Sequence, residues 1–173
     1  MIIVLMGYMG SGKSTIGRHL SEILSYQFQD LDTFIETTVG LSVPDIFKTK
    51  GELFFRKKEA ECLKILLESE DNLVLALGGG TPCYGTNMKM ISDASNVTCF
   101  YLKASIPTLV NRLMPEKEIR PLLNQIETKE ELAEFIGKHL FERNVFYSQS
   151  DVTITTDDKS IKSICESIVV ELI

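Results

Sequence analysis

The segment from Gly7 to Ser14 constrains the fold of this chain more than any other part of its sequence. It spells Gly-Tyr-Met-Gly-Ser-Gly-Lys-Ser, which matches the pattern G-x-x-x-x-G-K-[S/T]. The apolar residues 2–6 precede this segment, and an amphipathic stretch at residues 13–25 follows it. A glycine-rich turn between a buried strand and a helix predicts a P-loop, because its backbone N–H groups and the amino end of the helix attract phosphate. We expect Lys13 to bridge the phosphates of a nucleotide and the Ser14 hydroxyl to bind Mg²⁺.

A simpler interpretation of the same segment is a glycine-rich turn that caps the helix, with Ser11 as the N-cap residue. That interpretation explains neither the lysine at position 13 nor the strand and helix on either side. From average residue frequencies, the pattern arises by chance in well under ~1% of chains of this length. The P-loop is therefore the favoured interpretation.

Short apolar runs alternate with amphipathic stretches along the rest of the chain. Further strands are expected at residues 27–30, 73–77, 97–102 and 152–155, and helices at about 51–69, 86–94, 105–113, 129–147 and 160–172. This alternation predicts one α/β domain in which a parallel sheet is covered by helices on both faces. Residues 115–124 interrupt the rhythm with two prolines and several charged or amide side chains, which predicts a mobile surface loop.

The charge balance limits the kinds of partner that the chain can attract. Its 173 residues include 18 Lys and Arg against 24 Asp and Glu, a net charge of −6, which argues against nucleic acid or an anionic membrane as a partner. The apolar runs are far shorter than the ~20 residues of a membrane span, and no charged leader precedes the first of them. The four cysteines lack Cys-x-x-Cys spacing and are expected to be reduced thiols in a cytoplasmic protein.

Two carboxylates follow the second expected strand, in the sequence Asp30-Leu31-Asp32. Ligands of open parallel sheets bind at the carboxyl ends of the strands, which is where these side chains would lie. One carboxylate could order water on Mg²⁺ while the other accepts the proton of an acceptor hydroxyl. The alternative is that the two residues form a solvated turn or cap the next helix.

Two arginines fall on apolar stripes of the expected helices. Arg56 shares the spacing of Leu53, Ala60, Leu63 and Leu67, and Arg143 shares that of Ile136, Leu140 and Tyr147. An unpaired buried guanidinium is costly, so each arginine requires an anionic partner. One source of that anion is internal, for instance Glu59 for Arg56 or Glu142 for Arg143. The other is a small acidic substrate, most simply a carboxylate held bidentately, and the presence of a P-loop favours it.

Three glycines and one loop arginine complete the candidate site. Gly78-Gly79-Gly80 directly follows the strand at 73–77, which lacks the terminal acid of a Walker B strand, so Asp30 or Asp32 must serve Mg²⁺. Consecutive glycines let a ligand approach the backbone closely, with the Gly79 N–H as a donor; a plain turn is the alternative. Arg120 in the mobile loop could close over the γ-phosphate, although a loop arginine can also simply be solvated. The two histidines, His19 and His139, are assigned no role.

Taken together, these motifs resemble the shikimate kinase family from end to end. The matching segments are residues 5–15, Phe28-Gln29-Asp30-Leu31-Asp32 with Ile35-Glu36, Gly51-Glu52 with Phe55-Arg56 and Glu59, Gly78-Gly79-Gly80, Arg120-Pro121-Leu122, and Glu142-Arg143 with Tyr147. The resemblance implies a three-layer fold similar to nucleoside monophosphate kinases, with a five-stranded parallel sheet in the order 2-3-1-4-5 and a mobile lid. Residues 1–173 would form a single P-loop kinase domain, with the lid at about 112–124 and a substrate-binding helical region at about 32–60.

The resemblance also implies an activity and a role for each site residue. The activity is transfer of the γ-phosphoryl group of ATP to the 3-hydroxyl of shikimate, in the pathway to chorismate and the aromatic amino acids. ATP would be held by Gly10, Ser11, Gly12, Lys13, Ser14, Thr15, Arg112 and Arg120, and shikimate by Asp32, Arg56, Gly79 and Arg143. The catalytic set would be Lys13, Asp32 and Arg120, and Mg²⁺ would be bound by Ser14 and, through water, by Asp30. Arg112 could stack near adenine.

One segment departs from the family pattern, and two other functions compete. Residues 155–160 stand where the family often carries an arginine and a proline near adenine, which leaves Lys159 as a weak candidate there. The nearest competing function is a related small-metabolite kinase, such as a gluconate kinase. A guanine-nucleotide switch is disfavoured, because the chain has no Asn-Lys-x-Asp or Asp-x-x-Gly sequence. The size and fold are those expected of a monomer.

Overall fold

A single parallel sheet organises the molecule. The computed structural model describes residues 1–173, apart from the side chains of residues 119 and 121. The strands are β1 (Ile2–Met6), β2 (Gln27–Asp30), β3 (Leu73–Ala76), β4 (Val97–Lys103) and β5 (Val152–Thr155). They pair in the order β2-β3-β1-β4-β5, and every neighbouring pair is parallel. The expected fold class, strand positions and strand order are confirmed.

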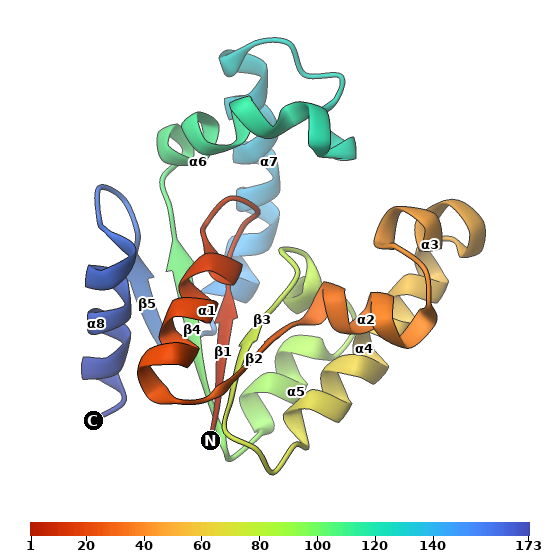
Figure 1. The fold of residues 1–173 in the computed structure, drawn as a ribbon. Coiled ribbons are helices and arrows are strands. Elements are labelled where there is room, and N and C mark those ends of the chain that lie inside the picture. The colour runs from red at the N-terminus through yellow and green to blue at the C-terminus, as the bar shows by residue number, and fades with distance from the viewer.

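Helices connect the strands and cover the sheet (Figure 1). They are α1 (Lys13–Leu24), α2 (Leu31–Val39), α3 (Val43–Lys50), α4 (Glu52–Leu67), α5 (Asn87–Asp93), α6 (Ile106–Leu113), α7 (Lys129–Tyr147) and α8 (Ile161–Glu171). Short 3₁₀ helices are η1 (Thr81–Cys83), η2 (Met114–Ile119) and η3 (Pro121–Leu123). Each helix expected from the sequence begins and ends within two residues of its predicted bounds.

The periodicity of the sequence did not predict the helices α2 and α3 individually, and the family resemblance implied only a helical region at about 32–60. Asp30 begins α2, because its side chain accepts hydrogen bonds from the backbone N–H groups of Asp32 and Thr33. Ser42 begins α3 in the same way, with its hydroxyl accepting from the N–H of Asp45. Both helices are a few turns long and are stabilised by their caps and by packing on α4, so apolar periodicity alone is too weak to define them.

Residues 115–124, the expected mobile surface loop, contain short helical turns. The 3₁₀ helices η2 and η3 occupy most of this segment. Pro115 lies in the first turn of η2, where its fixed φ suits a helical start and its missing N–H costs little. The sequence analysis did not identify these short helices, because proline marks the start of a helix as well as the end of one. The mobility of the segment stays a prediction.

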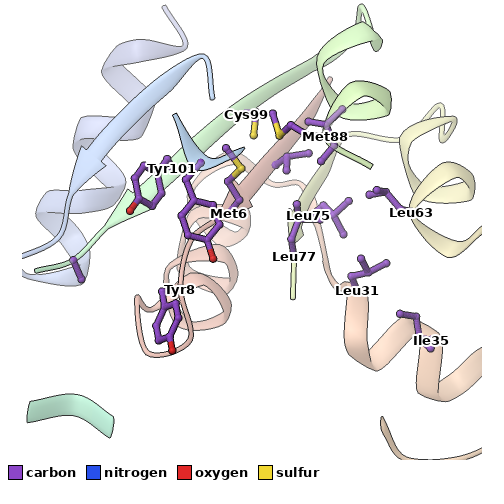
Figure 2. Close-up of a cluster of buried hydrophobic side chains, with 14 of the residues drawn as sticks. Met6, Tyr8, Leu31, Ile35, Leu63, Leu75, Leu77, Met88, Cys99 and Tyr101 are labelled. Atoms are coloured by element: carbon purple, nitrogen blue, oxygen red, sulfur yellow. The ribbon is translucent and has the colours of Figure 1, made fainter. Parts of the chain in front are cut away.

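The core has two layers, one on each face of β1. All five residues of this strand are buried, and their side chains alternate between the faces. Ile2, Val4 and Met6 contribute to a cluster that also contains residues of α4, α5 and α7, part of which is drawn in Figure 2. Ile3 and Leu5 contribute to a second cluster with residues of α1 and α8. These two layers hold the carboxyl ends of β1, β2 and β3 in fixed positions, and the candidate site is built there.

Two further findings concern the sequence as a whole. All four cysteines are free, as the spacing predicted, and Cys62, Cys99 and Cys165 are buried. Among the described helices, none is both long and apolar enough to span a membrane.

Candidate active site

A cavity of about 570 Å³ lies at the carboxyl edge of the sheet. Most of the residues predicted from the sequence line it: Gly10, Ser11, Gly12, Lys13, Ser14, Thr15, Asp30, Asp32, Gly79, Arg112 and Arg120. Glu116 and Lys159 also line it. The remaining two predicted residues, Arg56 and Arg143, lie against the Gly78–Gly80 turn beside the cavity. The fold therefore brings the whole predicted set into one region.

The P-loop has the backbone geometry that phosphate binding requires. Gly10 and Gly12 have φ values of 79° and 95°, a left-handed conformation that favours glycine. Gly12 is the residue that precedes α1, so the interpretation with Ser11 as N-cap is wrong. Because no side chain caps α1, its first N–H groups remain available to an anion. The Ser11 hydroxyl is buried within the loop instead.

Lys13 is held across the P-loop by two backbone carbonyl groups. Its Nζ donates to the carbonyl oxygens of Gly7 at 2.9 Å and Tyr8 at 3.0 Å. Burial lowers the pKa of Lys13 to about 8, although the nearby carboxylates of Asp32 and Asp30 oppose that shift. A bound polyphosphate would add negative charge beside this ammonium and favour its protonated form.

Asp30 both caps α2 and contacts the P-loop helix. Its Oδ1 accepts from the N–H of Asp32 at 3.1 Å, and its Oδ2 accepts from the Ser14 hydroxyl at 2.7 Å. The capping alternative is thus correct for Asp30, and it also fixes this carboxylate beside Ser14. A hydroxyl and a carboxylate are oxygen ligands of the kind that Mg²⁺ prefers, and this ion usually completes its coordination with water and substrate phosphates. In the described part of the chain no group of three or more His, Cys, Asp or Glu side chains is placed to hold a metal ion.

Asp32 lies two residues further along the chain, in the first turn of α2 and close to the Gly78–Gly80 turn. A methyl group added at Gly78 would lie 3.1 Å from its Oδ1. Burial raises the pKa of Asp32 to about 6, with smaller contributions from Asp30 and Glu59, while Lys13 lowers it. This carboxylate is therefore mostly ionised at neutral pH, but its affinity for a proton is higher than that of an exposed aspartate.

The three consecutive glycines each face a different part of the site. A Cβ at Gly79 would lie 3.6 Å from Nη1 of Arg143, and a Cβ at Gly80 would lie 3.5 Å from Nη2 of Arg56. None of the three has a positive φ, so backbone conformation does not require glycine here, and space is tightest at Gly78, where a Cβ would also lie 3.0 Å from Oγ1 of Thr81. Asp32 makes one of the closest of these contacts, whereas Arg56 and Arg143 lie at ordinary van der Waals distance from the turn.

Arg56 has the internal partner that the sequence left open as an alternative. Its Nη1 donates to Oε2 of Glu59 at 3.0 Å, and its guanidinium lies 3.5 Å from the centre of the Tyr84 ring. Glu59 is only 1% exposed and also accepts from the Thr81 hydroxyl at 2.7 Å. The buried carboxylate therefore holds Arg56 against the glycine turn.

The apolar stripe predicted for α4 was placed wrongly. Leu53 is 87% exposed, and the buried side of the helix is formed by Phe55, Glu59, Cys62, Leu63, Leu66 and Leu67. Arg56 borders this side and is not part of it. A charged residue occupies the centre of the buried stripe, and a pattern of apolar residues alone cannot locate it.

Arg143 lies on α7 between the glycine turn and the P-loop. Its guanidinium carbon is 5.4 Å from the centre of the Tyr8 ring. The stripe predicted for α7 is confirmed, because Ile136, Leu140 and Tyr147 are buried. Among the described residues, the ion pairs do not include the alternative one between Arg143 and Glu142. The positive charge of Arg143 thus remains directed towards the site.

Two tyrosines that carried no predicted role support Arg143 and the glycine turn. The Tyr147 hydroxyl donates to the carbonyl oxygen of Gly79 at 2.5 Å. The Tyr8 hydroxyl is 2.8 Å from Nδ1 of His139, one of the two histidines to which the sequence assigned nothing. Tyr147 follows Arg143 by four residues on the same stripe, a spacing that could have singled it out. For Tyr8 and His139 the sequence offers no comparable signal, because they are 131 residues apart.

The two remaining arginines come from the opposite side of the cavity. Arg112 donates to the carbonyl oxygen of Gly10 at 3.1 Å and to that of Thr156 at 3.4 Å, so it connects the P-loop to residues 155–160. Arg120 donates to Glu116 from Nε at 2.9 Å and from Nη2 at 2.6 Å. The surface salt bridge to Glu116 is partly exposed and is worth little, so a phosphate can compete for Arg120.

Comparison with known proteins places this site in a family. A family sequence model described as shikimate kinase matches residues 9–173. The chain is 48% identical to a shikimate kinase of Flavobacterium psychrophilum, over 96% of this chain and 95% of the relative. The crystal structure of shikimate kinase from Bacteroides thetaiotaomicron superposes with a TM-score of 0.90 at 32% identity, covering 99% of this chain and 98% of that one. Shikimate kinase from Acinetobacter baumannii in complex with shikimate gives a TM-score of 0.85 at 32% identity, covering 99% and 92%.

Proposed function

The chain belongs to the shikimate kinase family, and from this membership we infer that it is an ATP-dependent kinase that phosphorylates the 3-hydroxyl of shikimate. The products are shikimate 3-phosphate and ADP, on the route to chorismate and the aromatic amino acids. The observation that carries this function is the convergence of Asp32, Arg56 and Arg143 on one glycine turn beside a P-loop. When the carboxylate of shikimate binds to the two arginines, the hydroxyl groups of the same molecule would face Asp32 and the nucleotide phosphates.

The nucleotide is assigned to the P-loop side of the cavity. Backbone N–H groups of residues 10–15 would hold its phosphates, and Lys13 would move from the carbonyl oxygens of Gly7 and Tyr8 to bridge them. Ser14 would ligate Mg²⁺, and Asp30 would bind a water molecule of its shell. Mg²⁺ at this place would neutralise the charge that develops on the phosphate oxygens. Arg112 would lie against the adenine ring, with Lys159 on the same wall.

The acid substrate is assigned to the glycine turn. Arg56 and Arg143 would bind its carboxylate, and the Gly79 N–H would donate a hydrogen bond to it. Asp32 would accept a hydrogen bond from the 3-hydroxyl and orient that oxygen towards the γ-phosphorus. As the new O–P bond forms and the bond to ADP breaks, the hydroxyl proton passes to the Asp32 carboxylate. The raised pKa of Asp32, about 6, suits a group that must first be ionised and then hold a proton.

Closure is assigned to the segment that carries Arg120. On nucleotide binding, Arg120 would exchange Glu116 for the γ-phosphate and stabilise the charge of the transition state, an effect of roughly 10³ to 10⁵ in rate where such arginines are known. The lid would extend over residues 112–124 and the substrate-binding region over 32–60, within one domain. We further propose that the protein works as a monomer in the cytoplasm, in keeping with its free cysteines.

The function is tested by measuring ADP release with shikimate, gluconate and nucleoside monophosphates as separate acceptors. Shikimate alone is expected to support turnover, whereas turnover with gluconate and not shikimate would establish the competing kinase function. Arg143→Ala is expected to raise the KM for shikimate by at least about tenfold, because a charged hydrogen bond is lost. Arg18→Ala is a matched control, since Arg18 lies on α1 against Phe28 and away from the glycine turn. An unchanged KM in Arg143→Ala would contradict the carboxylate assignment.

A further inference from the structure

Tyr8 is the residue through which the P-loop contacts Arg143. Its backbone belongs to the loop, and its carbonyl oxygen accepts hydrogen bonds from Nζ of Lys13 at 3.0 Å and from the N–H of Ser11 at 3.1 Å. Its side chain points away from the cavity-lining backbone into the protein, where it is only 1% exposed. Figure 2 shows it beyond the end of β1, at the edge of the buried cluster.

The Tyr8 side chain has two partners on α7, separated by one helical turn. The guanidinium of Arg143 lies 5.4 Å from the ring centre, within the range of a cation–π interaction. The hydroxyl is 2.8 Å from Nδ1 of His139. His139 is in turn fixed by an edge contact to Phe135, with ring centres 4.3 Å apart. The tyrosine is thereby held at both ends, by its own backbone in the P-loop and by its hydroxyl on α7.

The protonation states favour this arrangement. Burial raises the pKa of Tyr8 to about 12, so its hydroxyl keeps its proton. Burial also lowers the pKa of His139, and the charge of Arg143 acts in the same direction, which favours the neutral imidazole. The Tyr8 hydroxyl and Nδ1 of a neutral imidazole form a hydrogen bond whose donor is set by the tautomer of the ring. The hydrogen bond between Tyr8 and His139 is therefore a stable feature of the fold around neutral pH.

We propose that Tyr8 is a positioning residue that holds Arg143 for the acid substrate and makes acid binding sensitive to the nucleotide. The identity of the two ligands rests on the proposed function. In the ligand-free protein Lys13 binds the Tyr8 carbonyl oxygen, and a nucleotide draws the Lys13 ammonium towards its phosphates. Tyr8 then loses one of its main-chain partners while its side chain remains in contact with Arg143. Tyr8 thus contacts Lys13, which binds the nucleotide, and Arg143, which binds the acid substrate.

A second contact between the same elements sets the expected size of the effect. Gly79 also lies against the P-loop and Arg143, since a Cβ at this position would be 3.3 Å from the N atom of Met9 and 3.6 Å from Nη1 of Arg143. Changes at Tyr8 leave this contact in place. We therefore expect the dependence of acid binding on nucleotide to be reduced in a Tyr8 variant and not abolished.

The test is a binding cycle measured by isothermal titration calorimetry. The Kd of shikimate is determined without nucleotide and with saturating Mg²⁺–ADP, and the ratio of the two values is the coupling factor. Wild-type protein is expected to have a factor different from one. In Tyr8→Leu, which removes the ring, the Kd of shikimate without nucleotide is expected to rise about three- to tenfold. The coupling factor of Tyr8→Leu is expected to move at least about threefold towards one.

Two more variants separate positioning from a general loss of structure. Tyr8→Phe keeps the ring beside Arg143 and removes only the hydroxyl, so its Kd for shikimate should stay closer to the wild-type value than that of Tyr8→Leu. Tyr26→Leu removes a tyrosine ring from the other core cluster and should change neither the Kd nor the coupling factor. The Kd of ADP alone should remain within about twofold of wild type in all variants, because the loop backbone is retained.

Three outcomes would overturn the proposal. A wild-type coupling factor of one would show that no coupling exists for Tyr8 to carry. A coupling factor unchanged in a folded Tyr8→Leu protein would show that the coupling runs elsewhere. If that variant does not fold, a shikimate Kd and coupling factor unchanged in Tyr8→Met, which also removes the ring, would show the same. Failure of the wild-type protein to bind or phosphorylate shikimate would instead contradict the proposed function, so the two failures are distinguishable.

Discussion

Asp32 is expected to destabilise the folded protein in its ionised form, so Asp32→Asn should unfold at a higher temperature than the wild type. The pKa of this carboxyl rises from an ordinary value of 3.8 to about 6 in the folded protein, chiefly because burial disfavours the charge. Each unit of difference between the folded and unfolded pKa corresponds to about 1.4 kcal/mol. At neutral pH the ionised carboxylate therefore costs at most about 3 kcal/mol, and about 2 kcal/mol is expected on replacement because a buried amide also needs partners.

The dependence on pH provides the sharper part of this test. Because the folded-state pKa is raised, the destabilising effect is complete above about pH 6 and disappears as the pH falls towards 3.8. In thermal unfolding followed by circular dichroism, Asp32→Asn should exceed the wild-type Tm by about 4–8 °C near pH 7.5. The difference should shrink towards zero near pH 4.

Asp71→Asn is the matched control for Asp32→Asn. It makes the same change in net charge at an exposed aspartate in the turn before β3, and its Tm should stay within about 1–2 °C of wild type at both pH values. The reasoning is refuted if Asp32→Asn is no more stable than wild type near pH 7.5. It is also refuted if the gain is the same near pH 4, since the charge of Asp32 would then not be its source.

Three other predictions concern activity. The kcat/KM for shikimate should rise with pH as Asp32 ionises near pH 6, and the kcat/KM for ATP, which reports the nucleotide-free enzyme, should fall as Lys13 loses its proton near pH 8. Profiles that are flat from pH 5 to 9 would contradict both assignments. Glu59→Gln should raise the KM for shikimate about tenfold, because it releases Arg56. The control Glu61→Gln changes a surface ion pair with Lys58 on the same helix and should leave this KM within about twofold of wild type. Equal effects of the two changes would mean that Glu59 does not position Arg56. Arg120→Ala should lower kcat about 10³-fold and change the KM for shikimate less, both measured under saturating ATP. A kcat near the wild-type value would exclude a role for Arg120 in the transition state.

Much of the fold was predictable because its strands and longer helices carry strong local patterns. β1 is a run of five apolar residues that ends at Gly7, and α7 begins with Thr128 and Glu131, which cap it reciprocally. The strand order came from resemblance to a family, since local patterns do not say which strands become neighbours. The helices α2 and α3 were missed because caps and contacts with α4 stabilise them more than periodicity does.

The candidate site was predictable to a different degree in its two halves. The phosphate-binding half lies almost entirely within residues 7–15, so its spacing is written in consecutive positions. The acid-binding half depends on residues from α2, α4, α7 and the turn after β3. For α4 the apolar pattern misplaced the buried stripe, because Glu59 occupies its centre and Leu53 faces solvent. Arg143 was placed correctly because the stripe of α7 consists of apolar residues.

The sequence by itself determined that this chain binds a nucleotide phosphate and supplied the set of charged groups around it. A P-loop depends on glycine conformations, a helix amino end and a lysine that are all close together along the chain. The tertiary structure alone decided how Asp32, Arg56 and Arg143 converge on three glycines, and that Tyr8 meets His139 across 131 residues. It also decided the pKa values of Asp32 and Lys13. The physical reason is that burial and Coulomb interactions depend on distances in space between groups that sequence position does not relate.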